Sequence, residues 1–246
     1  MTSQWKIAAG GGLGGALVAV VLVFAAAALG LLPVHNDSAI HDYLMAHPDI
    51  LAAMEQKAQE TQDEADETAS QDAVDKLGPK AFFDPRVAYI TGPANAKRTV
   101  VEFFDYNCPY CRASFPAMKK FYAQHKNDTR FAFIEFPIKG PDSTFAARVA
   151  LAARKQGDKY LALHFALMAE QDRVDTNLIL VDAQKAGLDM NRLAADMKSP
   201  EDANGINESL ALAEAAKVKG TPFFIINGHV RPGALADDVL RQMARS

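Results

Sequence analysis

The sequence predicts an α/β domain with an inserted helical subdomain, preceded by an N-terminal helical stalk. A strand–helix–strand pattern opens the domain, which we place at residues 83–246. A run of helical period follows at about 143–218, and a hairpin and a helix close the chain. Alternating strands and helices are typical of α/β folds, so the long helical run is interpreted as an insertion.

The composition narrows the function classes. The 246 residues suit one domain with additions, and 49% hydrophobic residues are ample for a core. The net charge of −4 argues against nucleic-acid binding, which needs a basic surface. Two cysteines cannot form a scaffold of several disulfides, so the core has to carry the stability and the thiols are available for chemistry.

Residues 1–33 predict export from the cytoplasm. Residues 7–32 carry no charge, and such a run is long enough to span a bilayer. Lys6 precedes the run and the next basic residue is Lys57, a bias that keeps the N-terminus in the cytoplasm. We expect an inner-membrane anchor, with a signal peptide cleaved within residues 25–28 as the alternative. Either places the rest of a bacterial chain in the periplasm, where disulfides persist.

Residues 34–82 predict the stalk. Residues 36–38 offer N-caps, Pro48 interrupts, and residues 51–77 contain neither glycine nor proline. The apolar stripe of this second helix is thin: Leu51, Met54, Ala58, Ala65, Ala69, Ala73 and Leu77. Since such a helix cannot form a core alone, it is either a solvated linker or a stalk that pairs with its own copies.

Patterns of the domain itself give its elements in order. Apolar, β-branched runs predict strands at 99–105 and 130–138, and a hairpin at 222–230 turns at Asn227-Gly228. Residues 109–125 predict a helix with Pro109 at its first position, which Pro116 should kink or restart. The insertion should break near Gly157, Gly187 and Pro200, and a helix closes the chain at 236–245.

The stretch CPYC places Cys108 where a strand turns into a helix. Helix N-termini stabilise anions, which lowers a thiol pKa below about 8.5. Cys111 lies one turn further and faces inward, so it can resolve a mixed disulfide formed by Cys108. A zinc half-site lacks further ligands, because the nearest histidine is His125. The other alternative is that both cysteines are inert core residues. Their position at the turn between a strand and a helix argues against it.

Two features outside CPYC support redox chemistry. Glu102 is a lone carboxylate in an apolar strand, either turned to solvent at a sheet edge or buried as a proton carrier for the thiols. Pro222 suits the first residue of a strand. A cis Thr221–Pro222 bond would leave the Thr221 backbone free to pair with a bound peptide.

The stretches EFFDYNCPYC and GTPFFIING together resemble the DsbA-like branch of the thioredoxin superfamily, over roughly residues 83–245. The resemblance implies a thioredoxin-like fold, with Cys108 as nucleophile, Cys111 as resolving thiol, Glu102 as buried acid and Pro222 as cis-proline. It implies no cofactor beyond a redox-active Cys108–Cys111 disulfide, which Pro109 and Tyr110 would modulate. The strongest oxidases of the branch have histidine where this chain has Tyr110, which puts strong oxidase character in doubt.

Residues 40–56, IHDYLMAHPDILAAMEQ, are similar to the stalk of ScsC-type (suppressor of copper sensitivity) proteins. This resemblance implies a homotrimer, disulfide isomerase activity on unfolded or misoxidised secreted proteins, and a membrane partner that keeps the thiols reduced. The alternatives are a monomeric anchored oxidase, a non-catalytic chaperone or binding module, and a protein that holds Cu(I) with its two thiolates.

Overall fold

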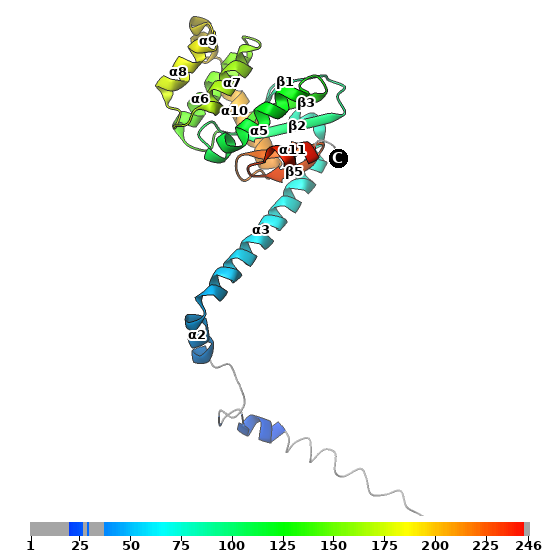
Figure 1. Cartoon of the computed structure of the whole chain (residues 1–246), viewed down its shortest axis with the longest axis vertical. Coiled ribbons are helices and arrows are strands. Elements are labelled where there is room, and N and C mark those ends of the chain that lie inside the picture. The colour runs from blue at the N-terminus through cyan, green and yellow to red at the C-terminus, as the bar shows by residue number, and fades with distance from the viewer. Residues whose placement is uncertain (1–19, 27–28, 30–36, 244–246) are drawn as a thin grey trace, which may run out of the picture. The chain divides into compact units, whose positions relative to one another are not determined.

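The computed structural model describes residues 20–26, 29 and 37–243 (Figure 1). Most of the expected anchor at residues 7–32 therefore lies outside the described residues. Over the parts that are described, no helix is long and apolar enough to cross a membrane.

The chain divides into two compact units, Met1–Thr61 and Gln62–Ser246. Helix α2 spans Asp37–Ala46 and helix α3 spans Pro48–Leu77, so the predicted interruption at Pro48 is confirmed. Large apolar side chains of α2 and the first turns of α3 are exposed: Ile40, Tyr43, Leu44, Met45, Leu51 and Met54. The first unit therefore presents apolar surface that it does not bury itself.

The last turns of α3 belong to the second unit, which differs from the expected domain start at residue 83. Ser70 and Val74 of α3 are 3% and 5% exposed, and Val74 joins a core with Phe82 and Phe103. The predicted apolar stripe missed Val74, and most contacts of these turns are made by polar side chains. Hydrophobic periodicity does not detect such contacts, so the sequence placed this segment in the stalk.

Five strands form one mixed sheet in the order β1-β3-β2-β4-β5. The parallel pair β2–β3 lies at the centre, and the other neighbours are antiparallel. The strands are β1 Ala88–Thr91, β2 Arg98–Phe104, β3 Thr129–Glu135, β4 Phe223–Ile226 and β5 His229–Pro232. The short edge strand β1 was not predicted, whereas the other four match the expected strands and hairpin.

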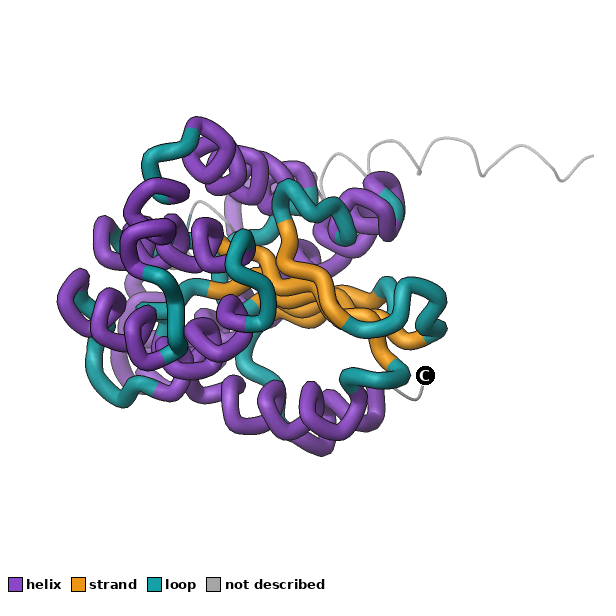
Figure 2. Tube along the Cα trace, turned by 90° about the horizontal axis from the view of Figure 1, so that it is seen from above, coloured by secondary structure: helices purple, strands orange, loops and turns teal. Residues whose placement is uncertain are grey.

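The helices of the second unit cover the sheet on both faces (Figure 2). Helix α5 runs unbroken through Pro116, so the predicted restart at that residue is wrong. The insertion between β3 and β4 consists of α6 to α10, and Figure 1 shows α6, α7, α8 and α9 as a cluster beside the sheet. The bounds are α4 Pro79–Phe82, α5 Pro109–His125, α6 Pro141–Arg154, α7 Lys159–Ala169, α8 Thr176–Lys185, α9 Met190–Asp196, α10 Pro200–Ala215 and α11 Asp237–Met243.

Alternation along the strands divides the interior into two cores. Val100 and Phe104 of β2 pack in one core with α5, α6 and α7, while Val101 and Phe103 pack in the other with α3 and α4. Because side chains alternate along a strand, Glu102 points to the same face as Val100 and Phe104. Both cysteines lie in that first core.

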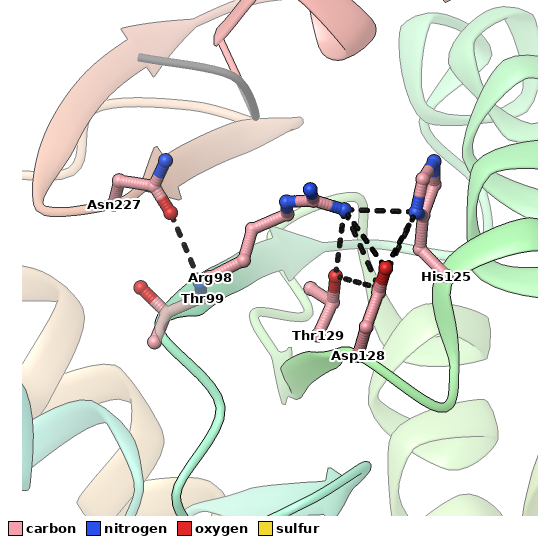
Figure 3. A network of polar contacts seen from close by, with 6 residues as sticks. All are labelled: Arg98, Thr99, His125, Asp128, Thr129 and Asn227. Atoms are coloured by element: carbon pink, nitrogen blue, oxygen red, sulfur yellow. Dashed lines mark hydrogen bonds and ion pairs between the residues drawn. The ribbon is translucent and has the colours of Figure 1, made fainter.

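Polar contacts anchor the start of β2 at the end opposite the cysteines (Figure 3). Arg98 Nη1 lies 2.8 Å from His125 Nδ1 and 3.3 Å from Asp128 Oδ1, which joins β2 to the end of α5. Thr99 N donates to Asn227 Oδ1 at 3.0 Å, and Asn227 N donates to Thr99 O at 3.0 Å. This cluster fixes the frame of the sheet and takes no part in the candidate site.

Candidate active site

Cys108 caps the N-terminus of α5, as the sequence predicts. Its backbone is extended, with φ −80° and ψ 118°, and Pro109 begins the helix where no amide donor is needed. Cys108 and Cys111 are free thiols and are 1% and 0% exposed, whereas Tyr110 between them is 65% exposed. The Cys108 sulfur therefore lies under the surface, beside an exposed aromatic ring.

The surroundings favour the thiolate of Cys108. The Cys111 thiol hydrogen-bonds to the Cys108 sulfur, and this lowers the pKa of Cys108 to about 5, although burial acts in the opposite direction. The backbone N–H groups of Tyr110 and Cys111 add to the lowering. These groups belong to the first turn of α5, where amides without helical partners stabilise an anion.

Cys111 and Glu102 are held in the opposite, protonated state. Burial raises the pKa of Cys111 far above its usual value, and the neighbouring Cys108 and Glu102 add to this. Burial also raises the pKa of Glu102 to about 8. Glu102 is 4% exposed on β2, which is paired on both sides, so the alternative of a solvent-facing edge residue is wrong.

The loop before β4 faces the Cys108 sulfur. The Thr221–Pro222 peptide bond is cis, and the Cys108 thiol donates to Thr221 O at 3.0 Å. Gly233 N donates to Pro222 O at 2.8 Å, which ties the loop to the end of β5. The structure thus brings together Cys108, Cys111, Thr221 and Pro222, with Glu102 on the sheet beneath.

Asp105 organises the loop between β2 and α5, a role that we did not predict. Its Oδ1 accepts from Asn107 N and Ser143 Oγ, each at 2.7 Å. Its Oδ2 accepts from Ile138 N and Lys139 N at 2.7 and 2.8 Å. The side chain is 2% exposed, so one carboxylate joins the cysteine loop to the loop after β3.

Replacing Asp105 with alanine is expected to lower the free energy of unfolding by about 3 kcal/mol or more, because it leaves buried donors without acceptors. Asp105→Asn should be nearly as severe, since its amide would place N–H groups against backbone N–H groups. Urea unfolding measures both effects, with exposed Asp72→Ala as the control. Equal stability of the Asp105 and Asp72 variants would contradict this role.

A buried polar cluster lies behind the cysteine loop and was also missed. Tyr106 and Tyr160 donate hydroxyl hydrogens to Glu135 Oε1 at 3.3 and 3.2 Å, and His164 Nδ1 lies 3.2 Å from the Tyr106 hydroxyl. Burial raises the pKa of Glu135 to about 8, against the nearby charge of Arg154. Burial lowers the pKa of His164 to about 3, so its ring is neutral. The cluster fixes Tyr106, two residues before Cys108, to the insertion.

The described residues contain no group of three or more histidine, cysteine, aspartate or glutamate side chains that could hold a metal ion. The site combines the Cys108 thiol, whose pKa is lowered, with the Cys111 thiol, whose pKa is raised, beside the cis-proline Pro222. A stabilised thiolate attacks disulfides, and a second thiol one turn away resolves the product.

This fold and this pair of thiols define a thiol–disulfide oxidoreductase with a thioredoxin-like fold. The DSBA-like thioredoxin domain family matches residues 99–244. The chain belongs to this family, and its resemblance to the DsbA/ScsC type is confirmed.

Solved structures agree with this assignment. A thioredoxin-like oxidoreductase from Silicibacter pomeroyi is 38% identical with a TM-score of 0.63, covering 68% of this chain and 96% of that one. BcfH from Salmonella enterica Typhimurium is 27% identical with a TM-score of 0.66, covering 94% and 100%. ScsC from Proteus mirabilis, in a transitional conformation, is 26% identical with a TM-score of 0.63, covering 85% and 91%.

Curated relatives include much longer proteins. The Na(+)/H(+) antiporter NhaA 3 of Salinispora tropica is 30% identical over 167 residues, which are 67% of this chain and 25% of that protein. This chain thus corresponds to about a quarter of that relative.

Proposed function

We propose that this protein exchanges disulfides in exported protein substrates through Cys108 and Cys111, and that it acts mainly as a disulfide isomerase in the periplasm. One observation carries the proposal: the buried Cys108 sulfur, with its pKa lowered to about 5, faces the carbonyl of Thr221 beside the cis-proline. A client chain that pairs with the Thr221 backbone brings its disulfide to this sulfur.

Disulfide exchange begins with a mixed disulfide between Cys108 and the client, which can then be resolved in two ways. The Cys108 thiolate attacks one client sulfur, the client S–S bond breaks, and the other client sulfur leaves as a thiolate. In isomerisation a different client thiolate then attacks the mixed disulfide, which restores the Cys108 thiolate without net electron transfer. If Cys111 attacks instead, the client leaves reduced and a Cys108–Cys111 disulfide remains, with two electrons transferred to the client.

Glu102 supports the second route as a proton acceptor. Cys111 has to lose its proton before it attacks, and its pKa is raised by burial. Glu102 lies on the same sheet face as the cysteines, and the negative charge of its ionised form contributes to that rise. The ionised form of Glu102, a minor population at pH 7 because its pKa is about 8, can take the proton from Cys111 at the moment of attack.

A refolding assay on scrambled ribonuclease tests the isomerase proposal. The reduced protein should restore ribonuclease activity without an added oxidant. If it does not, but the oxidised protein oxidises reduced ribonuclease, the alternative of an anchored oxidase holds. Titration with Cu(I), with and without alkylated thiols, tests the Cu(I)-handling alternative.

The exposed apolar residues of the first unit support a homotrimeric stalk. Burying Leu51, Met54 and Ile40 against copies of themselves stabilises an assembly by roughly 25 cal/mol per Å² of apolar area. A trimer would place several active sites around one misfolded client, which favours isomerisation. We further propose a membrane partner that keeps the thiols reduced, and an anchor formed by residues 7–32.

We expect the part of the chain from residue 34 to be a trimer by light scattering. Leu51→Lys combined with Met54→Lys should give a monomer, because charges cannot be buried in an apolar seam, while exposed Gln56→Lys is the control. The monomer should still oxidise small dithiols and lose most isomerase activity. A monomeric wild-type protein at moderate salt would rule out the stalk and favour the monomeric oxidase.

A further inference from the structure

The last turns of α3 hold the loop that carries Thr221. Ser70 Oγ donates to Lys217 O at 3.1 Å. Lys217 has a φ of +56°, a backbone conformation that is costly for residues other than glycine. Asp66 Oδ1 lies 2.6 Å from Lys219 Nζ. Both contacts fall within four residues of Thr221, so α3 bears directly on the backbone that faces Cys108.

The same face of α3 also holds the hairpin that follows the cis-proline. Gln71 Nε2 donates to Gly228 O, and Val230 N donates to Gln71 Oε1, each at 2.9 Å. Glu67 Oε1 pairs with Arg231 Nη1 at 2.6 Å. Since these residues and Ser70 recur at helical spacing, one helix face contacts both sides of the cis-proline segment. We call α3 residues 63–74 the α3 wall.

A pocket of about 420 Å³ lies between the α3 wall and the cis-proline loop. Pro222, Phe223 and Pro232 provide its apolar lining, and α3 contributes polar groups. Thr221, which also lines the pocket, accepts the hydrogen bond of the Cys108 thiol. The pocket and the Cys108 sulfur therefore have Thr221 as a common neighbour.

We propose that the α3 wall is a second wall of the client site, and that the pocket takes a side chain next to the client cysteine. The occupant is an extended segment of client polypeptide that carries the exchanging disulfide, and in this respect the inference rests on the proposed function. A chain lying along Thr221 places alternate side chains on opposite sides, one of them over the pocket. Asp66 and Ser70 are positioning residues, because they act through the loop and do not touch the reacting sulfur.

The contacts differ in what they contribute. The Asp66–Lys219 pair joins a partly exposed carboxylate to an exposed lysine, at 30% and 66%, and adds little to stability. Asp66→Asn should therefore leave the fold intact while it loosens the loop. Ser70 is 3% exposed and donates its hydroxyl hydrogen to Lys217 O, so Ser70→Ala removes a partly buried hydrogen bond and is the stronger change.

Exchange kinetics with two kinds of substrate test the proposal. The variants are Asp66→Asn and Ser70→Ala, with Asp72→Asn and Thr68→Ala as matched controls on the exposed side of α3. The substrates are a fluorescent peptide disulfide of about ten residues, a length that a strand-like groove can contact, and glutathione disulfide. We expect kcat/KM for the peptide to fall about threefold to tenfold, mainly through KM, as one lost hydrogen bond implies. The kinetics with glutathione disulfide should show no comparable change in either variant, and Asp66→Asn should also keep the thermal stability of the wild type.

Cross-linking provides a second measurement that does not depend on these variants. In Cys111→Ser protein, a peptide carrying a photoreactive group beside its cysteine is trapped on Cys108, and mass spectrometry should locate cross-links within residues 63–70. Unchanged peptide kinetics, equal losses with both substrates, or cross-links only outside the α3 wall would overturn the inference. A wild-type protein that exchanges with neither substrate would overturn the proposed function itself.

Discussion

Cys108→Ser is expected to abolish disulfide exchange, by on the order of a thousandfold or more, because a serine hydroxyl cannot attack a disulfide. The matched variant Cys111→Ser should still attack and then stop at the mixed disulfide. The two variants therefore distinguish the nucleophile from the resolving thiol. Electrophoresis of acid-quenched reactions with a peptide disulfide measures both outcomes.

Alkylation supplies an independent measurement of the same assignment. The pKa of Cys108 is lowered to about 5 by the Cys111 thiol and by the amides of the first turn of α5. Iodoacetamide should therefore label Cys108 first in the reduced protein, with a rate that is half-maximal near pH 5. Faster labelling of Cys111, or a midpoint near the usual thiol value, would contradict the assignment.

Reduced protein should gain stability through Cys108 as the pH rises from 5 to 9. The thiol pKa is about 5 in the folded protein against an ordinary 9.0, so the unfolded chain binds more protons in this window. The contribution is complete above pH 9 and is lost as the pH falls through 5. Cys108→Ser removes this contribution at pH 7. Urea unfolding under reducing conditions at several pH values measures the difference between the two proteins.

Glu102→Gln is the control with the opposite sign. Burial raises the pKa of Glu102 to about 8 from 4.5, so its contribution to stability is present below pH 4.5 and is lost as the pH rises through 8. The glutamine variant should become more stable relative to wild type across this window, by about 1.4 kcal/mol per pH unit. For each variant, the free energy of unfolding is compared with that of the wild type at every pH. A difference that stays constant with pH would contradict the lowered pKa of Cys108 or the raised pKa of Glu102.

Local sequence patterns predicted most of the elements around Cys108 and Pro222. The buried strand that ends at Phe104, the helix that begins at Pro109 and the proline before β4 each have a signal within a few residues. Because Cys108 and Pro222 sit at the ends of such elements, the sequence placed them correctly. The apolar strand around Glu102 left open whether this residue is buried or faces solvent, and the structure shows that it is buried. The cis state of the Thr221–Pro222 bond was permitted by the sequence and is found in the structure.

Side chains that act across long stretches of chain gave no such signal. Asp105 looks like an ordinary turn residue, yet its carboxylate accepts from residues more than thirty positions away. Glu135 lies within the strand predicted at 130–138, and only the folded insertion brings Tyr160 and His164 to its side of the core.

The sequence by itself determined four of the five strands, the helical insertion and the CPYC thiol pair at a strand-to-helix turn, because these follow from hydrophobic period and from residues at element ends. The thioredoxin-like class followed from the resemblance of EFFDYNCPYC and GTPFFIING to the DsbA-like branch. Tertiary structure alone decided where the domain begins, what holds the cysteine loop, and which face of α3 contacts the cis-proline segment. These features depend on single hydrogen bonds and ion pairs of polar side chains between distant segments, such as Ser70 to Lys217 O. A polar side chain on a helix has the same local sequence pattern whether it faces solvent or a partner, so only packing distinguishes the two.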